Sequence, residues 1–253
     1  MFNQERKNKI LEIIEEKGAV SVTQLTKMLG ASESTIRRDL IELSKKGNIN
    51  KVHGGATLSG KQFIAHEADV SSKETENTDQ KKLIAEYCAA QIQNDDFVYI
   101  DAGTSTLFMI EYIRSNCTAS FVTNGIVHAK RLADKGLTVY VLGGRLKKVT
   151  EAIVGLTAAR NIHDFNFTKA FIGANGVSDK GGFTTPDTEE AYVKAAAMDN
   201  AFVSYVLADS SKFSKISSVR FGALDDACIV TDREPDEIYR SKTVIKVVEK
   251  KNN

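Results

Sequence analysis

Tryptophan is absent from the sequence, and its 253 residues include only 2 prolines and 3 cysteines. So little proline argues against a proline-rich linker. Cys88, Cys117 and Cys228 are scattered, odd in number and without metal-ligand spacing. This pattern is typical of a protein in a reducing cytoplasm and not of a disulfide framework, and it predicts no metal site.

Long apolar runs are missing as well. No stretch approaches the roughly 20 residues that a membrane-spanning helix needs, and the polar start over residues 1–9 lacks the apolar core of a signal peptide. We therefore expect a cytoplasmic protein. A Walker loop and the three-glycine dinucleotide fingerprint are also lacking, so we expect no cofactor.

The charge is divided unequally along the chain. The net charge is +1, but residues 1–57 hold 10 Lys and Arg against 7 Asp and Glu, whereas the remainder holds 24 against 26. An apolar fraction of 42% over this length is enough for one large domain or two smaller ones. The charge division suits a basic, DNA-binding N-terminal head on a body that does not bind DNA.

The stretch from Ser32 to Leu43 organises the head. Ile36, Leu40 and Leu43 are spaced i, i+4, i+7, which predicts one apolar face of a helix. Ser32 precedes this helix and is a natural N-cap. The opposite face carries short hydroxyls and then two guanidinium groups, from Ser34, Thr35, Arg37 and Arg38.

That polar face suits a recognition helix in a DNA major groove. Hydroxyls and backbone amides can meet phosphates there, while arginine reaches a guanine edge or another phosphate. The alternative is a surface helix with a solvated basic face. The residues before this helix favour the recognition helix. They predict a helix over residues 3–17, a short helix capped by Thr23, and a turn at Gly30-Ala31, which together make a helix-turn-helix.

A β wing is expected after Gly47. In residues 48–56, Ile49 and Val52 can pack inward while Lys51 and His53 point to solvent as phosphate-contact candidates. A hydrogen-bonded hinge role for His53 is equally open.

The two motifs, Ser34 to Leu40 and Val52-His53-Gly54-Gly55-Ala56, resemble the winged helix-turn-helix of DeoR-family bacterial transcription regulators. The family usually has arginine where Lys51 stands, and often valine in place of Ala31. The resemblance implies that residues 1–57 bind operator DNA through Ser32, Ser34, Thr35, Arg37, Arg38, Lys51 and His53.

The rest of the chain begins with a polar joint. Residues 58–75 are expected to be a linker, with plain disorder as the alternative. From residue 76 to 253, apolar runs alternate with helical stretches, which predicts a Rossmann-like α/β domain with a mainly parallel sheet. Strands are expected at 97–100, 120–122, 137–142, 170–172, 203–208 and 227–230, and helices at 107–113, 126–135, 156–162 and 189–198.

Polar, small residues follow five of these strands. Ligands of parallel α/β sheets bind beyond the carboxyl ends of the strands, so five such loops at one edge predict a polar pocket. The first loop, residues 101–106, leads into a helix whose free N–H groups and dipole suit a phosphate.

These loops resemble the DeoR-family sensor domain, which is similar in fold to ribose-5-phosphate isomerase and binds phosphorylated sugars. The resemblance places Asp101, Gly103, Thr104, Ser105 and Thr106 at the phosphate end, and Thr123, Asn124, Gly143, Gly144, Asn175, Glu190, Lys194, Asp209 and Lys212 around the rest. For Glu190 and Lys194, four residues apart on one helix, a surface ion pair is the alternative.

Residues 184–194 also look like regulators of fructose-utilisation operons, which respond to fructose phosphates. The leading hypothesis is a repressor of a sugar-utilisation operon that responds to a sugar phosphate. We expect a homo-oligomer, a dimer or a tetramer, because one head offers few contacts to an operator. A sugar-phosphate isomerase with a DNA-binding head is the alternative, with Glu190 or Asp209 as base and Lys212 polarising a carbonyl. A structural DNA-binding protein with a vestigial body leaves the polar loops unexplained.

Overall fold

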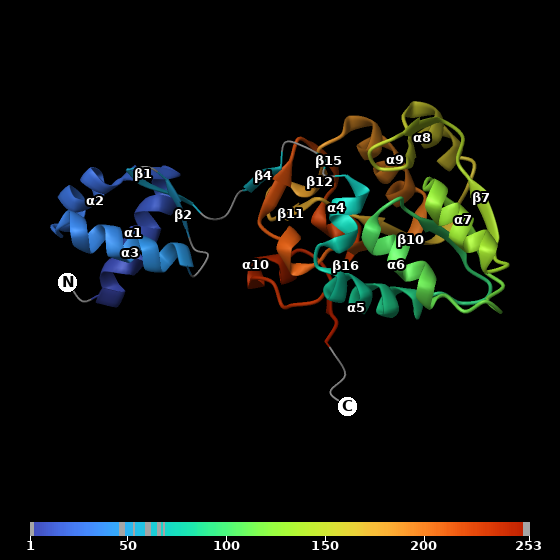
Figure 1. The fold of residues 1–253 in the computed structure, drawn as a ribbon, viewed down its shortest axis with the longest axis horizontal. Coiled ribbons are helices and arrows are strands. Elements are labelled where there is room, and N and C mark those ends of the chain that lie inside the picture. The colour runs from blue at the N-terminus through green and yellow to red at the C-terminus, as the bar shows by residue number, and fades with distance from the viewer. Residues whose placement is uncertain are drawn as a thin grey trace. The chain divides into compact units, whose positions relative to one another are not determined.

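The computed structural model describes residues 3–45, 49–52, 54–58, 62–64, 67 and 69–249. The chain divides into two compact units, Met1–Gln62 and Phe63–Asn253, which we call the head and the body (Figure 1). From the sequence we expected the head to end at residue 57 and a linker to run to residue 75. The division lies at residue 62, so residues 63–75 of the expected linker group with the body.

The described part of the head is a winged helix-turn-helix. Helices α1 (Asn3–Lys17), α2 (Val22–Leu29) and α3 (Glu33–Lys45) pack on a small sheet in which β3 (Gly55–Leu58) runs antiparallel to both β1 (Ala19–Ser21) and β2 (Ile49–Val52). The predicted apolar face of α3 lies in the core of the head, where Ile36, Leu40 and Leu43 join Ile10 and Leu25.

The start of α2 differs from the prediction. Ser21, and not Thr23, is its N-cap: the Ser21 hydroxyl accepts the Gln24 N–H at 3.1 Å, and the Gln24 side chain accepts the Ser21 N–H at 2.9 Å. This reciprocal capping box satisfies two donors at once, which a cap at Thr23 does not offer. Gly30 ends the helix with φ of 61°, a left-handed conformation that favours glycine.

A seven-stranded sheet forms the centre of the body as described, and its neighbouring strands run parallel. The predicted strands are all present within one to three residues of their expected bounds. The spatial order is β17 (Ile245–Val247), β16 (Cys228–Thr231), β13 (Ala201–Leu207), β10 (Phe167–Gly173), β5 (Phe97–Ile100), β6 (Ser120–Thr123) and β7 (Thr138–Val141).

Helices cover both faces of this sheet (Figure 1). Alternate residues of β5 point to opposite faces: Val98 and Ile100 pack with α5 (Thr78–Ala89), α6 (Thr104–Tyr112) and α7 (Ile126–Asp134), whereas Tyr99 packs with α8 (Leu156–Ile162) and α9 (Thr188–Asp199). This alternation explains why the central strands read as continuous apolar runs.

Several short elements were not predicted. A β8–β9 hairpin and a three-stranded antiparallel sheet of β11, β12 and β15 lie beside the main sheet, and β4 pairs with β14. Their bounds, with those of the remaining short helices, are β4 (Gln62–Ile64), α4 (Val70–Thr75), β8 (Arg145–Lys147), β9 (Ala152–Val154), β11 (Gly176–Ser178), β12 (Gly182–Thr185), η1 (Ser210–Lys212), β14 (Lys215–Ser217), β15 (Val219–Gly222), η2 (Leu224–Asp226) and α10 (Glu237–Arg240).

The strand order reverses between β5 and β10. From β5 the chain adds β6 and then β7 on one side, and it then adds β10, β13, β16 and β17 on the other side. In open parallel sheets the ligand crevice lies at such a switch point, beyond the carboxyl ends of the two central strands. The topology therefore directs attention to the residues that follow β5 and β10.

Candidate DNA-binding surface and ligand cavity

The polar side of α3 is open to solvent. Ser32, Ser34, Arg37 and Arg38 are exposed, and Thr35 is half-buried. The Ser32 hydroxyl accepts the Thr35 N–H at 3.3 Å, so Ser32 caps α3 as predicted. Arg37 meets Glu33 at 3.3 Å, but both side chains are more than half exposed, so this surface pair costs little to break.

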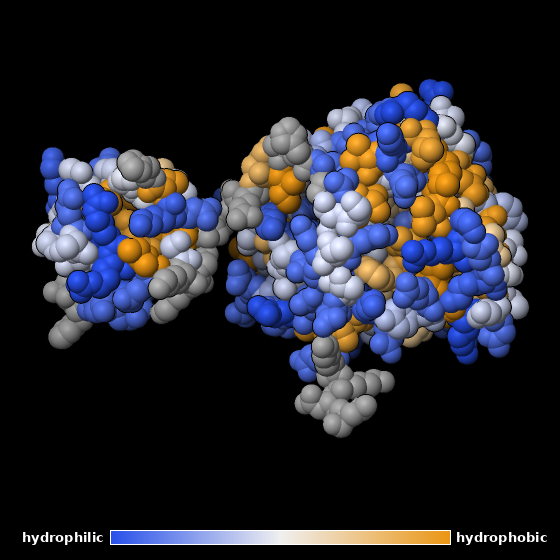
Figure 2. Space-filling model, in the orientation of Figure 1, coloured by the Kyte–Doolittle hydropathy of each residue, from blue (hydrophilic) through white to orange (hydrophobic). Residues whose placement is uncertain are grey.

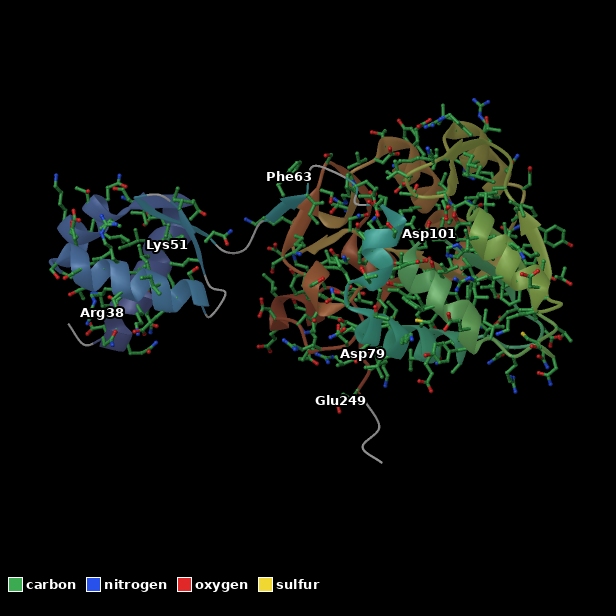
Figure 3. The ribbon with its side chains drawn as sticks, viewed as in Figure 1. Arg38, Lys51, Phe63, Asp79, Asp101 and Glu249 are labelled. Atoms are coloured by element: carbon green, nitrogen blue, oxygen red, sulfur yellow. The ribbon has the colours of Figure 1, made fainter. Side chains whose placement is uncertain are left out.

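The wing adds a further cation to the head. Lys51 is exposed on β2, and Figure 3 shows that it comes from a different element than Arg38 of α3. A recognition helix with a basic wing can place cations on DNA phosphates while α3 meets base edges. His53, the other wing candidate, lies outside the described residues.

Asp39, in the middle of the Arg37–Leu40 motif, points away from the solvent-exposed face. It is buried, and its carboxylate accepts from Arg6 of α1, with Nε to Oδ2 at 2.6 Å and Nη2 to Oδ1 at 3.3 Å. This two-point pair ties α1 to α3. Helical spacing places Asp39 between the apolar and the polar face of α3. The sequence around Asp39 does not indicate that Arg6, 33 positions earlier, is its partner.

We expect Asp39→Ala to destabilise the head by about 2 kcal/mol, because it removes a charge-assisted pair and leaves the Arg6 donors without their acceptor. All 7 tyrosines lie in the body, so their fluorescence reports the body alone. In urea titrations, helical circular dichroism should be lost earlier than in the wild type while the tyrosine transition stays in place. An unchanged circular dichroism profile would show that the pair contributes nothing.

A cavity lies at the switch point of the body sheet. Its walls include Ala102 to Ser105 after β5 and Gly173 to Asn175 after β10, together with residues of α4, α5 and α9 and of η1 after β13. The cavity volume is about 70 Å³. Its full lining is Glu67, Val70, Lys73, Lys81, Ala102, Gly103, Thr104, Ser105, Thr150, Gly173, Ala174, Asn175, Glu190, Lys194, Leu207 and Lys212.

Helix α6 presents its N-terminus to this cavity. Thr104 and Ser105 form its first turn, where backbone N–H groups have no partner within the helix. The N–H of Gly103 is already taken by the Thr106 hydroxyl at 3.0 Å. Free amides, two hydroxyls and the positive end of a helix dipole are a suitable site for an anion.

Four lysines surround the same space. The ammonium of Lys212 has no acceptor among the residues that the structure describes, whereas Lys194 binds Asp101 at 2.5 Å and the Gly173 carbonyl at 3.0 Å. Lys81 donates to the Lys73 carbonyl, and Lys73 pairs with Glu67. The cavity thus joins a helix N-terminus to an excess of cations close by.

Burial lowers the pKa of Lys73 to about 8. Glu190 opposes this shift, while Lys194, Lys212 and Lys147 add to it by repulsion. Lys73 is thus a buried lysine with further cations nearby, and a bound anion would favour its charged form.

Buried side chains fix the loop after β5, residues 101–106, by hydrogen bonds. His128 contacts the Gly103 carbonyl at 3.0 Å and the Thr106 hydroxyl at 3.2 Å through Nε2. Burial lowers the pKa of His128 to about 4, so the ring is neutral at pH 7 and donates from Nε2 to the carbonyl. Asn124 accepts from the Tyr99 hydroxyl at 3.0 Å and from the Ala102 N–H at 2.9 Å.

The structure separates the sequence-predicted ligand residues into two groups. Those that line the cavity are Gly103, Thr104, Ser105, Asn175, Glu190, Lys194 and Lys212. Those outside its lining are Asp101, Thr106, Thr123, Asn124, Gly143, Gly144 and Asp209. The second group supports the loops: for example, Thr123 accepts the Gly125 N–H at 3.1 Å, and Gly143 donates to Asn161 at 2.9 Å.

Glu190 and Lys194 do not form the surface ion pair that their spacing allowed. Both are buried and have partners on other elements. Glu190 accepts from Lys147 and Thr150, each at 2.9 Å, and Lys194 binds Asp101. Lys147 thereby ties the β8–β9 hairpin to α9 at the cavity wall.

Sequence reasoning missed Glu67, Lys73 and Lys81 as cavity residues. They lie in the stretch expected to be a linker and in the helix that follows it. Within the described part of the chain, no cluster of three or more His, Cys, Asp or Glu side chains could hold a metal ion. Among the described helices, none has the length and apolarity to cross a membrane.

Comparison with known protein families matches both units. The DeoR-like helix-turn-helix domain matches residues 6–62, and the DeoR C terminal sensor domain matches residues 76–233. The chain belongs to the DeoR family. Its body is therefore a DeoR sensor domain, and its head is a DeoR DNA-binding domain.

Relatives in this family match over nearly the full length. A protein described as an uncharacterized HTH-type transcriptional regulator FruR, from Bacillus subtilis (strain 168), is 40% identical over 98% of this chain and 99% of its own length. The lactose phosphotransferase system repressor of Staphylococcus aureus (strain NCTC 8325 / PS 47) is 32% identical over 98% and 100%. DeoR-family membership and these relatives make the chain a DNA-binding transcriptional regulator.

A solved structure, ribose 5-phosphate isomerase A from Methanocaldococcus jannaschii, is similar with a TM-score of 0.41 and 14% identity, over 54% of this chain and 55% of that one.

Proposed function

We propose that this DeoR-family regulator represses a sugar-utilisation operon and that a phosphorylated sugar in the body cavity controls its affinity for the operator. The observation that carries the proposal is the α6 N-terminus, lined by Thr104 and Ser105, beside the ammonium of Lys212, which has no acceptor among the described residues. Such a site favours a phosphate over an uncharged sugar. The relatives named for FruR and for a lactose phosphotransferase system support sugar metabolism as the setting.

The sugar end of the ligand would meet other polar groups of the lining. Asn175 and the Glu190 carboxylate line the cavity and can bind hydroxyl groups. We name fructose 1-phosphate as the first candidate, because residues 184–194 resemble regulators of fructose operons and a FruR protein is 40% identical.

Thermal unfolding of the full chain against sugar phosphates tests this proposal. Tyrosine fluorescence follows the body, because all 7 tyrosines lie there. A ligand at 100 times its dissociation constant should stabilise the body by about 2.7 kcal/mol. Fructose 1-phosphate, fructose 6-phosphate, glucose 6-phosphate and ribose 5-phosphate form the panel, with unphosphorylated fructose as control. A shift with no phosphorylated member, or an equal shift with fructose, contradicts a phosphate-dependent site.

Ligand affinity should fall above pH 8. Protonated Lys73 favours an anion, and burial lowers its pKa to about 8, so binding takes up a proton at higher pH. We expect the affinity at pH 9 to be about tenfold weaker than at pH 7, as measured by calorimetric titration. Lys73→Met should lose this dependence, and a flat wild-type profile would show that Lys73 carries no charge relevant to binding.

We propose that the chain is a sensor and not an enzyme. The isomerase alternative assigns the base to Glu190 or Asp209. Glu190 is engaged by Lys147 and Thr150. Asp209 does not line the cavity, although its Oδ2 has no partner among the described residues. Conversion of any sugar phosphate in the panel by the purified protein would overturn this part of the proposal.

We also propose that the regulator acts in the cytoplasm as a dimer or larger homo-oligomer, since one head offers few contacts for operator specificity. Hydrophobic residues gather on the face of the body over α7 and α8 (Figure 2). Exposed large apolar side chains of this region include Ile126, Tyr140, Val141, Leu146 and Leu156. Sedimentation velocity tests this, and a monomer at micromolar concentration in the presence of operator DNA contradicts it.

A further inference from the structure

The segment that leads from the head into the body is itself a wall of the ligand cavity. Glu67, Val70 and Lys73 line the cavity, and the segment is fixed at its far end by Asn77, which donates to Asp209 and to Ser211, each at 3.1 Å. A segment with these contacts is a part of the ligand site and not only a tether between two domains.

Two lining residues of this segment form an ion pair with each other. Lys73 binds Glu67, both side chains are largely buried, and Glu67 Oε1 also accepts from Asn175 at 3.1 Å. The second oxygen, Glu67 Oε2, is buried without a partner among the described residues. Glu67 is therefore the counter-ion of Lys73, the lysine that belongs to the interdomain segment.

The walls of the cavity differ in how they are held in the fold. The wall formed by α4 is a helix of six residues, whereas α5 and α9 have twelve residues each, and the loops at 102–105 and 173–175 follow strands of the central sheet. Within the body, α4 packs chiefly against α6.

We propose that Lys73 is an effector-binding residue, and that it exchanges the Glu67 carboxylate for the phosphate of the ligand. The inference rests on the proposed function and names its regulation: the residue that detects the ligand lies on the segment that carries the head. A ligand that binds Lys73 favours one arrangement of this segment over another, and that preference is the coupling between effector and operator.

Two variants separate a ligand role from a structural ion pair. Lys73→Met removes the ammonium and keeps most of the stem, and it should weaken binding of fructose 1-phosphate and of inorganic phosphate by about tenfold or more. Glu67→Gln removes the competing carboxylate and should tighten binding by about threefold or more. Lys82→Met, an exposed lysine on the neighbouring helix α5, is the matched control and should bind as the wild type does.

Calorimetric titration of the full chain distinguishes the outcomes. Opposite effects of Lys73→Met and Glu67→Gln support the exchange. If both variants weaken binding equally, the ion pair has a structural role only. If Lys73→Met binds as tightly as the wild type, Lys73 does not contact the sugar phosphate. Either result overturns the inference and leaves the proposed function standing. If the wild type binds neither probe at millimolar concentration, the proposed function fails and the inference falls with it.

Discussion

Asp101→Ala is expected to lower the free energy of unfolding of the body by about 3–5 kcal/mol, because it leaves Lys194 charged and buried without its carboxylate. Asp101 is 2% exposed and Lys194 6% exposed, so water replaces little of the lost contact. Asp101 Oδ2 also accepts the Gly173 N–H at 3.1 Å, which joins the loops after β5 and β10. The variant should therefore also release the loop after β5 from the loop after β10.

Urea unfolding followed by tyrosine fluorescence measures this loss in the body. Asp95→Ala, an exposed aspartate just before β5, is the matched control and should change stability by less than about 0.5 kcal/mol. The double variant Asp101→Ala with Lys194→Met should recover part of the loss, since it removes the unpaired charge. A single Asp101→Ala variant as stable as the control would mean that the pair is not buried in solution.

This expectation changes how Asp101 can be used experimentally. From the sequence it was a candidate at the phosphate end of the site, whereas in the structure its carboxylate is taken up by Lys194 and a backbone amide. Loss of ligand binding in Asp101→Ala would therefore follow from disruption of the loops. Lys73 and Lys212 are better probes of the ligand itself, because they line the cavity.

The double variant Arg37→Ala, Arg38→Ala should bind operator DNA about 100-fold more weakly, since each exposed arginine of a recognition helix contributes about 1–3 kcal/mol. Both side chains lie on the solvent face of α3, away from the core of Ile36, Leu40 and Leu43. The fold of the head should therefore survive. If either arginine contacts phosphate, the salt dependence of binding should also become shallower.

Fluorescence anisotropy at fixed salt, on DNA fragments selected by the wild-type chain from a random pool, measures this loss. Arg114→Ala, an exposed arginine of the body, is the control and should leave DNA affinity unchanged. Affinity for sugar phosphate should be the same in the double variant as in the wild type. Parallel loss of both affinities would contradict the assignment of DNA and effector to separate units.

The sequence predicted the elements whose periodicity is strong. Ile36, Leu40 and Leu43 define α3, and the apolar runs of β5, β6 and β16 stand out against their polar flanks. The β8–β9 hairpin and the β11–β12–β15 sheet were missed, because strands of three or four residues are too short to show alternation. Their positions are set by tertiary pairing and not by local pattern.

The candidate site was predictable in location but not in detail. Polar loops after the strands marked the sheet edge, yet Asp101 is oriented by Lys194, which lies 93 positions later, and Glu67 by Asn175, 108 positions later. Spacing along the chain carries no signal for such partners. Lys73 was missed for a related reason: a polar stretch resembles a linker until the fold shows that it returns to the cavity.

The most direct test of ligand-controlled repression is the operator affinity of the full chain with and without saturating fructose 1-phosphate. The account predicts a 5- to 150-fold change, which is the usual range of allosteric coupling at about 1–3 kcal/mol. Lys73→Met should show little change at the same ligand concentration. Operator affinity that stays constant in the wild type, at ligand concentrations that stabilise the body, would contradict the central claim that the cavity controls the head.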